Sequence, residues 1–176
     1  LNRLVPVLDV VLGPLEEDII ILAGRPGMGK TTLASSAAVG YAANGEPMLY
    51  LHGEMSEDQM DMRSTADIAH AMGHPIPHHD IRHARLTPDQ MHRLDRAKLH
   101  AEQLPLDYEE IRGMNLEKIE SAIARKVAFW AALGKKLRGV VIDYVGLCGA
   151  LDSQGRPIDD DRKRINAVLV GLDAIR

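Results

Sequence analysis

Eight residues in the first fifth of the chain have the types and spacing to bind phosphate. Residues 24–31 read Gly-Arg-Pro-Gly-Met-Gly-Lys-Thr, which matches the phosphate-binding pattern G-x-x-x-x-G-K-[ST] without a mismatch. Glycines let backbone N–H groups turn toward phosphate oxygens. In such a loop Lys30 reaches the β- and γ-phosphates, and the Thr31 hydroxyl ligates Mg²⁺. The motif therefore predicts a nucleoside triphosphate ligand, bound by Gly24, Arg25, Pro26, Gly27, Met28, Gly29, Lys30, Thr31 and Thr32.

Two carboxylates follow strand-like segments and could act on the same ligand. Residues 140–143 are an apolar run that ends in Asp143, the pattern of a strand whose terminal acid holds the Mg²⁺ shell. Glu54 comes two residues after an expected strand over residues 48–52, where a carboxylate could polarise a water that attacks the γ-phosphate. From spacing alone, a second role for Glu54, as a carboxylate that caps the next helix or faces solvent, remains equally open.

The elements around these residues alternate between strand and helix. The β-branched run Asp18–Ala23 predicts a buried parallel strand before the loop, and the small residues of 32–39 predict a helix after it. Ser56 with Gln59 and Thr87 with Gln90 are capping boxes that open helices. Further strands are expected over 104–108, at a sheet edge because of Pro105, and over 138–144, with helices over 56–72, 87–103, 115–134 and 161–176. This order predicts an α/β fold with a mostly parallel sheet flanked by helices.

Composition limits the class of protein. The chain has 176 residues, 45% hydrophobic and 26% charged, with a net charge of −4, so we expect one globular domain over 1–176 without a globally basic surface. Cys148 is the only cysteine, which favours a reducing cytoplasm. No apolar run approaches the roughly 18 residues of a membrane span, so we expect no membrane contact. Asp9 argues against reading the apolar residues 1–15 as a signal peptide.

Three segments together resemble one family, the DnaB-type replicative helicases. Residues 24–31 resemble its "RPxMGKT" loop, residues 52–63 its "SLEMSxxQLxxR" segment, and residues 141–147 its "IDYLQL" strand, while Leu8, Asp9 and Gly13 resemble its lead-in. The resemblance implies a RecA-like P-loop core, ATP hydrolysis with Mg²⁺, and a homo-hexamer that moves along single-stranded DNA. It also implies that Glu54 is the catalytic carboxylate, acting with Lys30. Primase and a helicase loader are candidate partners.

The chain departs from that family at two positions and in extent. Gly53 stands where the family usually has Leu, and Gly146 stands where it usually has Gln. The family's collar domain, its later core strands, its second DNA loop and its arginine finger have no counterpart in this sequence. We therefore expect a RecA-like domain that is incomplete at its C-terminal end.

Two further clusters carry weaker signals. Arg156, Arg162, Lys163 and Arg164 follow Asp143 in a region that faces DNA in the resembled family, although a solvated surface next to Asp159, Asp160 and Asp161 is the favoured alternative. His70, His74, His78, His79 and His83 have spacings that could bind zinc, but a solvated loop is again favoured.

Other functions stay open at this point. A RecA, KaiC or RadA type of ATPase that is not a helicase would carry the same loop. A module that binds ATP without hydrolysing it is a second alternative, and a small-molecule kinase is a more distant third.

Overall fold

The computed structural model describes residue 5, residues 19–152 and residues 154–174. Outside the described residues lie Asp18 and the apolar segment 1–15 apart from Val5. That segment includes Leu8, Asp9 and Gly13. In chain order the elements are α2 (Lys30–Ala42), β1 (Met48–His52), α3 (Glu57–Ala71), α4 (His78–Arg82), α5 (Pro88–Ala101), β2 (Leu106–Glu110), α6 (Leu116–Ala132), β3 (Gly139–Asp143), the 3₁₀ turn η1 (Val145–Leu147) and α7 (Asp161–Ala174).

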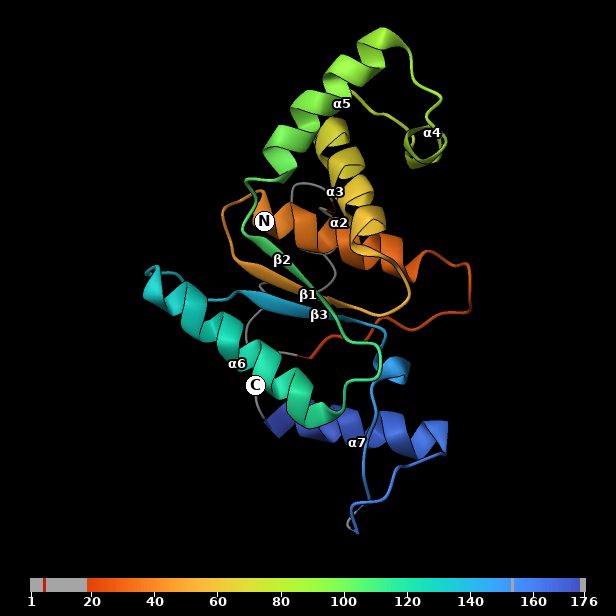
Figure 1. The fold of residues 1–176 in the computed structure, drawn as a ribbon, viewed down its shortest axis with the longest axis vertical. Coiled ribbons are helices and arrows are strands. Elements are labelled where there is room, and N and C mark those ends of the chain that lie inside the picture. The colour runs from red at the N-terminus through yellow and green to blue at the C-terminus, as the bar shows by residue number, and fades with distance from the viewer. Residues whose placement is uncertain (1–4, 6–18, 153, 175–176) are drawn as a thin grey trace.

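The three described strands form one parallel sheet in the order β2-β1-β3. β1 is central and fully buried, and its side chains alternate between two apolar layers. Met48 and Tyr50 pack with residues of α2, whereas Leu49 and Leu51 pack with residues of α6 and α7. Figure 1 shows α2 and α3 on one side of the strands and α6 and α7 on the other. The expected α/β fold with a parallel sheet flanked by helices is confirmed.

Local capping signals were reliable guides to where the helices begin. Ser56 and Thr87 each accept a hydrogen bond from the backbone N–H three residues on, and Gln59 and Gln90 complete both capping boxes. The Asn115 side chain accepts from Lys118 N–H at the start of α6. β2 begins two residues later than expected, because the chain from α5 continues as turns through Leu104, whose N–H donates to the Ala101 carbonyl. Its expected position at a sheet edge holds within the described sheet.

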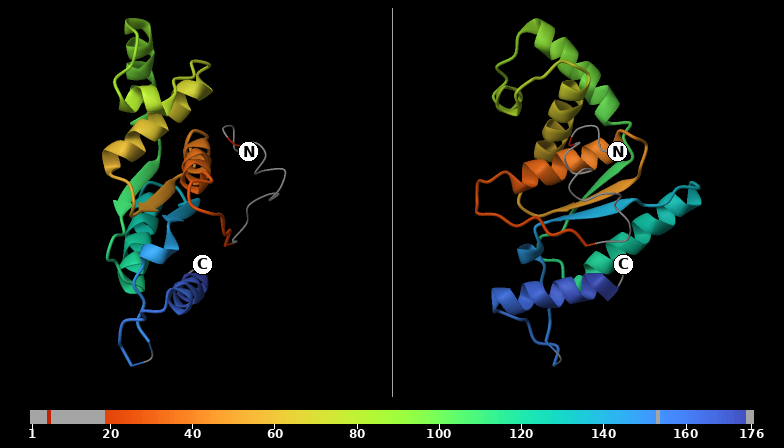
Figure 2. Two further views of the ribbon diagram at one scale, coloured as in Figure 1. Left: turned by 90° about the vertical axis from the view of Figure 1, so that its right-hand side faces the viewer. Right: turned by 180° about the vertical axis from the view of Figure 1, so that it is seen from behind.

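The strand expected before the phosphate-binding loop is absent. Residues 19–23 form no strand, and Ile21 is 66% exposed. Figure 2 shows this stretch running outside the sheet toward α2. A strand needs a hydrogen-bonding neighbour, and among the described residues nothing pairs with the outer edge of β3. The prediction of a buried strand here was wrong, because residues 19–23 pair with none of the described strands and stay exposed.

None of the described helices is both long and apolar enough to cross a lipid bilayer.

Candidate nucleotide-binding site

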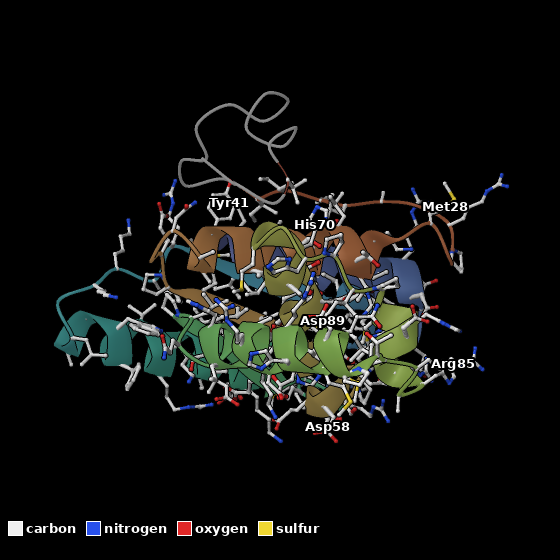
Figure 3. All side chains as sticks on the ribbon, turned by 90° about the horizontal axis from the view of Figure 1, so that it is seen from above. Met28, Tyr41, Asp58, His70, Arg85 and Asp89 are labelled. Carbon is white, nitrogen blue, oxygen red and sulfur yellow. The ribbon has the colours of Figure 1, made fainter. Side chains whose placement is uncertain are left out.

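The glycine-rich loop leads directly into the N-terminus of α2. Gly29 is the N-cap residue and has a φ of 83°, and Gly27 has a φ of 78°, so both adopt the left-handed region that glycine tolerates. A Cβ at either position would meet no atom within 4 Å, so the loop is open around them. Met28 is 73% exposed and projects at the periphery of the molecule (Figure 3). The first N–H groups of α2 are thus presented beside an accessible loop, as anion binding requires.

The Lys30 side chain folds back over this loop. Its ammonium donates hydrogen bonds to the carbonyls of Gly24, at 2.8 Å, and Arg25, at 3.1 Å. The cation is therefore held within the ring of residues that would surround a phosphate chain. Thr31 and Thr32 follow on the first turn of α2.

Glu54 leaves the sheet at the end of β1 and is exposed. The turn that carries it is fixed on both sides. The His52 Nδ1–H donates to the Met55 carbonyl at 2.8 Å, and the Arg112 guanidinium donates to the Gly53 carbonyl at 2.8 and 3.1 Å. Backbone and side-chain contacts thus hold the chain on either side of Glu54 while its carboxylate stays accessible.

Asp143 ends β3 beside the end of β1. His52 lies opposite Asp143 in the parallel register, and the Gly53 N–H donates to the Asp143 carbonyl at 3.1 Å. The Asp143 carboxylate accepts a hydrogen bond of 2.8 Å from the Tyr50 hydroxyl. The peptide bond from Asp143 to Tyr144 is cis. Figure 1 shows the loop before α2 at the end of the sheet where β1 and β3 finish.

The donors at this edge fit Mg²⁺ and a nucleotide. A threonine hydroxyl and a carboxylate are hard oxygen ligands of the kind that Mg²⁺ prefers. The open glycine loop, the helix N-terminus and the Lys30 ammonium match the charge of a phosphate chain.

Both departures from the family pattern have local packing reasons. A Cβ on Gly53 would lie 2.5 Å from Leu147 Cδ1 in η1 and 3.5 Å from Ile111 Cγ1. A Cβ on Gly146 would overlap the ring of Tyr144. In this chain, therefore, the segment after β3 packs closely against the exit of β1.

The basic residues after Asp143 differ in how accessible they are. The Arg156 guanidinium pairs with the Asp152 carboxylate at 3.0 Å. Arg164 is partly buried and donates to the Gly146 carbonyl at 3.2 Å and to Asp161 at 2.5 Å. Arg162 and Lys163 are exposed on the first turn of α7, whose N-terminus is capped by the Asp160 carboxylate. Arg162 and Lys163 are thus the more accessible pair.

The histidine-rich segment is partly helical, and three of its five histidines are exposed. It contains α4, and its side chains reach different partners. His74 Nδ1 lies 3.2 Å from an Arg93 nitrogen, His79 and His83 pack ring to ring, and His78 is half-buried. Over the described ranges, 19–152 and 154–174 with residue 5, no group of three His, Cys, Asp or Glu side chains is arranged to hold a metal ion.

Several contributors to this site have no motif of their own. Arg112 lies 59 residues from the carbonyl that it binds, and Tyr50 lies 93 residues from Asp143. Arg63 was visible only as the last residue of the segment 52–63, and its partner, the Thr32 hydroxyl, could not be read from the sequence.

Comparison with known proteins places this arrangement in one family. Residues 5–171 match the family described as DnaB-like helicase C terminal domain. The chain belongs to this family. The replicative DNA helicase DnaB of Nostoc sp. (strain PCC 7120) is 31% identical over 131 residues, which are 74% of this chain and 14% of that protein. The DNA repair protein RadA of Helicobacter pylori (strain J99) is 42% identical over 60 residues, 33% of this chain and 13% of that protein.

A solved structure shares the fold of this DnaB-like domain. The ATPase domain of G40P aligns with a TM-score of 0.71 at 21% identity, over 86% of this chain and 50% of that one. The RecA-like fold expected from the sequence is thereby confirmed. The chain spans half of that structure and 14% of the Nostoc helicase.

Proposed function

We propose that the chain is the ATPase motor domain of a DnaB-type replicative helicase, which hydrolyses ATP to move along single-stranded DNA and unwind duplex DNA. The observation that most supports this is the meeting of the β1 and β3 ends. The register places His52 opposite Asp143, so Glu54, two residues after His52, follows β1 at the end of the sheet where the glycine loop lies. Family membership supplies the reaction class for this arrangement.

Each residue has a defined part in the proposed site. Residues 24–32 bind the phosphates through backbone N–H groups, and the Lys30 ammonium stabilises the charge of the transferring phosphoryl group. Glu54 orients the attacking water and accepts its proton. Thr31 and Asp143 would hold Mg²⁺, which neutralises charge on the β- and γ-phosphate oxygens when bound.

The assembly and its partners are part of the same proposal. We propose a cytoplasmic homo-hexamer in which a neighbouring subunit supplies an arginine to the phosphates. Arg162 and Lys163 are proposed DNA-phosphate contacts. Arg156 and Arg164 are weaker candidates, because Asp152 and Asp161 pair with them. Primase and a helicase loader are proposed further partners.

The test is ATP hydrolysis by the full native chain, with and without single-stranded DNA, beside Lys30→Ala and Glu54→Gln. We expect DNA to stimulate turnover, and both variants to lose it. Glu54→Gln should still bind ATP, since its amide leaves the loop intact, whereas Lys30→Ala should bind it weakly. Nucleotide binding without DNA-stimulated turnover would instead favour a nucleotide-gated binding module.

A RadA-like ATPase is the second candidate, because the local identity to RadA exceeds that to DnaB over a shorter stretch. Strand separation distinguishes the two. A helicase should displace a labelled strand from a forked duplex in an ATP-dependent reaction, and DNA-stimulated hydrolysis without displacement would favour the RadA-like activity.

A further inference from the structure

A small cavity lies between three helices, next to the first turn of the phosphate-binding helix. Its volume is about 60 Å³. The walls come from α2, α3 and α4, and the polar residues that line it are Thr32, Ser35, Ser36, Arg63, Asp67 and His78. Of these residues, Thr32 is part of the proposed nucleotide site and Arg63 donates a hydrogen bond to it, whereas the other four have no role in that site.

Three of the lining residues each have a buried side-chain atom that lacks a hydrogen-bond partner among the described residues. These atoms are Ser35 Oγ, Arg63 Nε and His78 Nε2. Ser35 itself is only 1% exposed. Buried polar atoms are nearly always satisfied by protein or by ordered water. A cavity of this volume has room for one or two waters, because a water molecule occupies about 30 Å³ in the liquid. A water here would find the two to four polar partners that such sites require.

Arg63 connects this cavity to the phosphate-binding loop. Its Nη1 donates a hydrogen bond of 2.9 Å to the Thr32 hydroxyl, 31 residues away in sequence. Thr32 directly follows the proposed Mg²⁺ ligand Thr31. The guanidinium therefore joins α3 to the first turn of α2, and its Nε–H group is buried without a hydrogen-bond partner among the described residues. The planar guanidinium offers both donors in a fixed geometry, which a lysine cannot reproduce.

We propose that Arg63 is a positioning residue for nucleotide binding, which holds the Thr32 hydroxyl at the start of α2 while a water in the cavity bridges its Nε to Ser35 and His78. Arg63 and the water fix the first turn of α2 before a nucleotide arrives, so less order has to be created on binding. This inference rests on the proposed nucleotide-binding function.

A double-mutant cycle tests the link through Thr32. The affinity of the full native chain for a fluorescent ADP analogue with Mg²⁺ is measured for the wild type, Arg63→Met, Thr32→Val and the double variant. We expect each single variant to bind about tenfold more weakly, as the loss of a hydrogen bond to a charged group predicts. The double variant should bind no more weakly than the weaker single variant, because both changes remove the same contact. Independent effects that multiply would overturn the proposal.

Two variants separate positioning from general loss of charge or folding. Arg63→Lys retains one donor for Thr32 and should recover part of the affinity. It also serves as the test variant if Arg63→Met lowers the thermal midpoint so far that the fold is lost. Arg96→Met, an exposed position on α5, removes an arginine from a helix and should leave the affinity unchanged. Equal losses in Arg63→Met and Arg96→Met would contradict the specific role.

The outcomes distinguish this inference from the proposed function. If the wild type does not bind the analogue, the nucleotide-binding proposal itself fails. If the wild type binds it, Lys30→Ala does not, and Arg63→Met binds as tightly as the wild type, then only the role of Arg63 is wrong. A high-resolution crystal structure should show a water within hydrogen-bonding distance of Arg63 Nε, Ser35 Oγ and His78 Nε2, and a dry cavity would refute the water bridge.

Discussion

The Tyr50 hydroxyl, in the middle of β1, donates a hydrogen bond of 2.8 Å to the carboxylate of Asp143 at the end of β3. Tyr50 is fully buried. Burial, and then the neighbouring Asp143 charge, raise the pKa of the Tyr50 phenol well above its usual range, so it stays protonated and acts as the donor. A residue of the central strand thus orients the Asp143 carboxylate.

Removal of this hydroxyl should weaken the use of Mg²⁺. In Tyr50→Phe we expect the Mg²⁺ concentration that half-saturates nucleotide binding to rise about tenfold, because groups that orient a metal ligand typically have effects of that size. The measurement is a Mg²⁺ titration at fixed fluorescent nucleotide. Tyr108→Phe is the matched control, since the Tyr108 hydroxyl bonds to Ser64 on α3 and not to a carboxylate. The same Mg²⁺ dependence in both variants would contradict this role.

Gly53 should be hard to replace even though its backbone is not strained. In Gly53→Ala the new methyl would lie 2.5 Å from Leu147 Cδ1, so Leu147 must move. We expect the free energy of unfolding to fall by about 1–3 kcal/mol, the usual range for overpacking, as measured by urea denaturation. Leu147→Ala should recover part of that loss in the double variant. Gly149→Ala is the control, because its nearest neighbour would be a carbonyl at an ordinary 3.7 Å. A Gly53→Ala variant as stable as Gly149→Ala would argue against close packing at this point.

Asp67 should make the stability depend on pH. Burial raises the pKa of its carboxyl, while the hydrogen bond from Ser36 and the charge of Arg63 oppose that rise. Since the folded-state pKa lies above the unfolded value, this group contributes most stability below the ordinary pKa, and that contribution is lost as the pH rises through the folded-state pKa. Asp67→Asn keeps an oxygen that accepts from Ser36 without a buried charge.

We therefore expect Asp67→Asn to raise the thermal midpoint near pH ~7 and to lose that advantage near pH ~4. Thermal unfolding followed by circular dichroism across this range is the measurement. Asp95→Asn, on the exposed side of α5, should show no such pH-dependent difference. A gain that is the same at both pH values would mean that the charge of Asp67 is not its cause.

Cys148 should react slowly with thiol reagents in the folded protein. It is 1% exposed, and burial raises the pKa of its thiol to about 11. The neutral thiol is favoured by folding, so its contribution to stability is present below its ordinary pKa of 9.0 and is lost as the pH rises toward about 11. We expect the rate of reaction with a disulfide reagent to be low in buffer and to increase strongly in denaturant. A native rate close to the denatured rate would show that this part of the core opens readily.

The sequence predicted best what depends on neighbours along the chain. The capping boxes at Ser56 and Thr87 need only four consecutive residues, and both formed as expected. The strand before the glycine loop was predicted from the same kind of local signal and did not form. Strand pairing depends on a partner elsewhere in the fold, which the apolar run Ile19–Ala23 does not specify.

The same distinction between local motifs and distant contacts applies to the residues of the candidate site. Lys30, Thr31 and Asp143 stand in recognisable motifs, and the structure brings the glycine loop and the strand ends to one side of the sheet. Tyr50 and Arg112 could not be found in this way, because each acts through a contact with a segment more than 50 residues away. A tyrosine in a buried strand most often only packs in the core. Nothing in the sequence around Tyr50 indicates that its hydroxyl binds the Asp143 carboxylate.

The pairing of His52 with Asp143 has a consequence for how this protein can vary. His52, two residues before Glu54, lies one step of a parallel ladder, about 4.8 Å, from Asp143, so the spacing of Glu54 from Asp143 depends on this alignment and not on the helices that connect the two strands. Insertions or deletions in α3 to α6 would leave that spacing unchanged as long as β1 and β3 keep their alignment. A slip of two residues would keep every side chain on its own face of the sheet, yet would carry one carboxylate about 7 Å past the other. The alignment of the two five-residue strands therefore sets the relative position of the two carboxylates, whereas the segment that connects the strands can change in length.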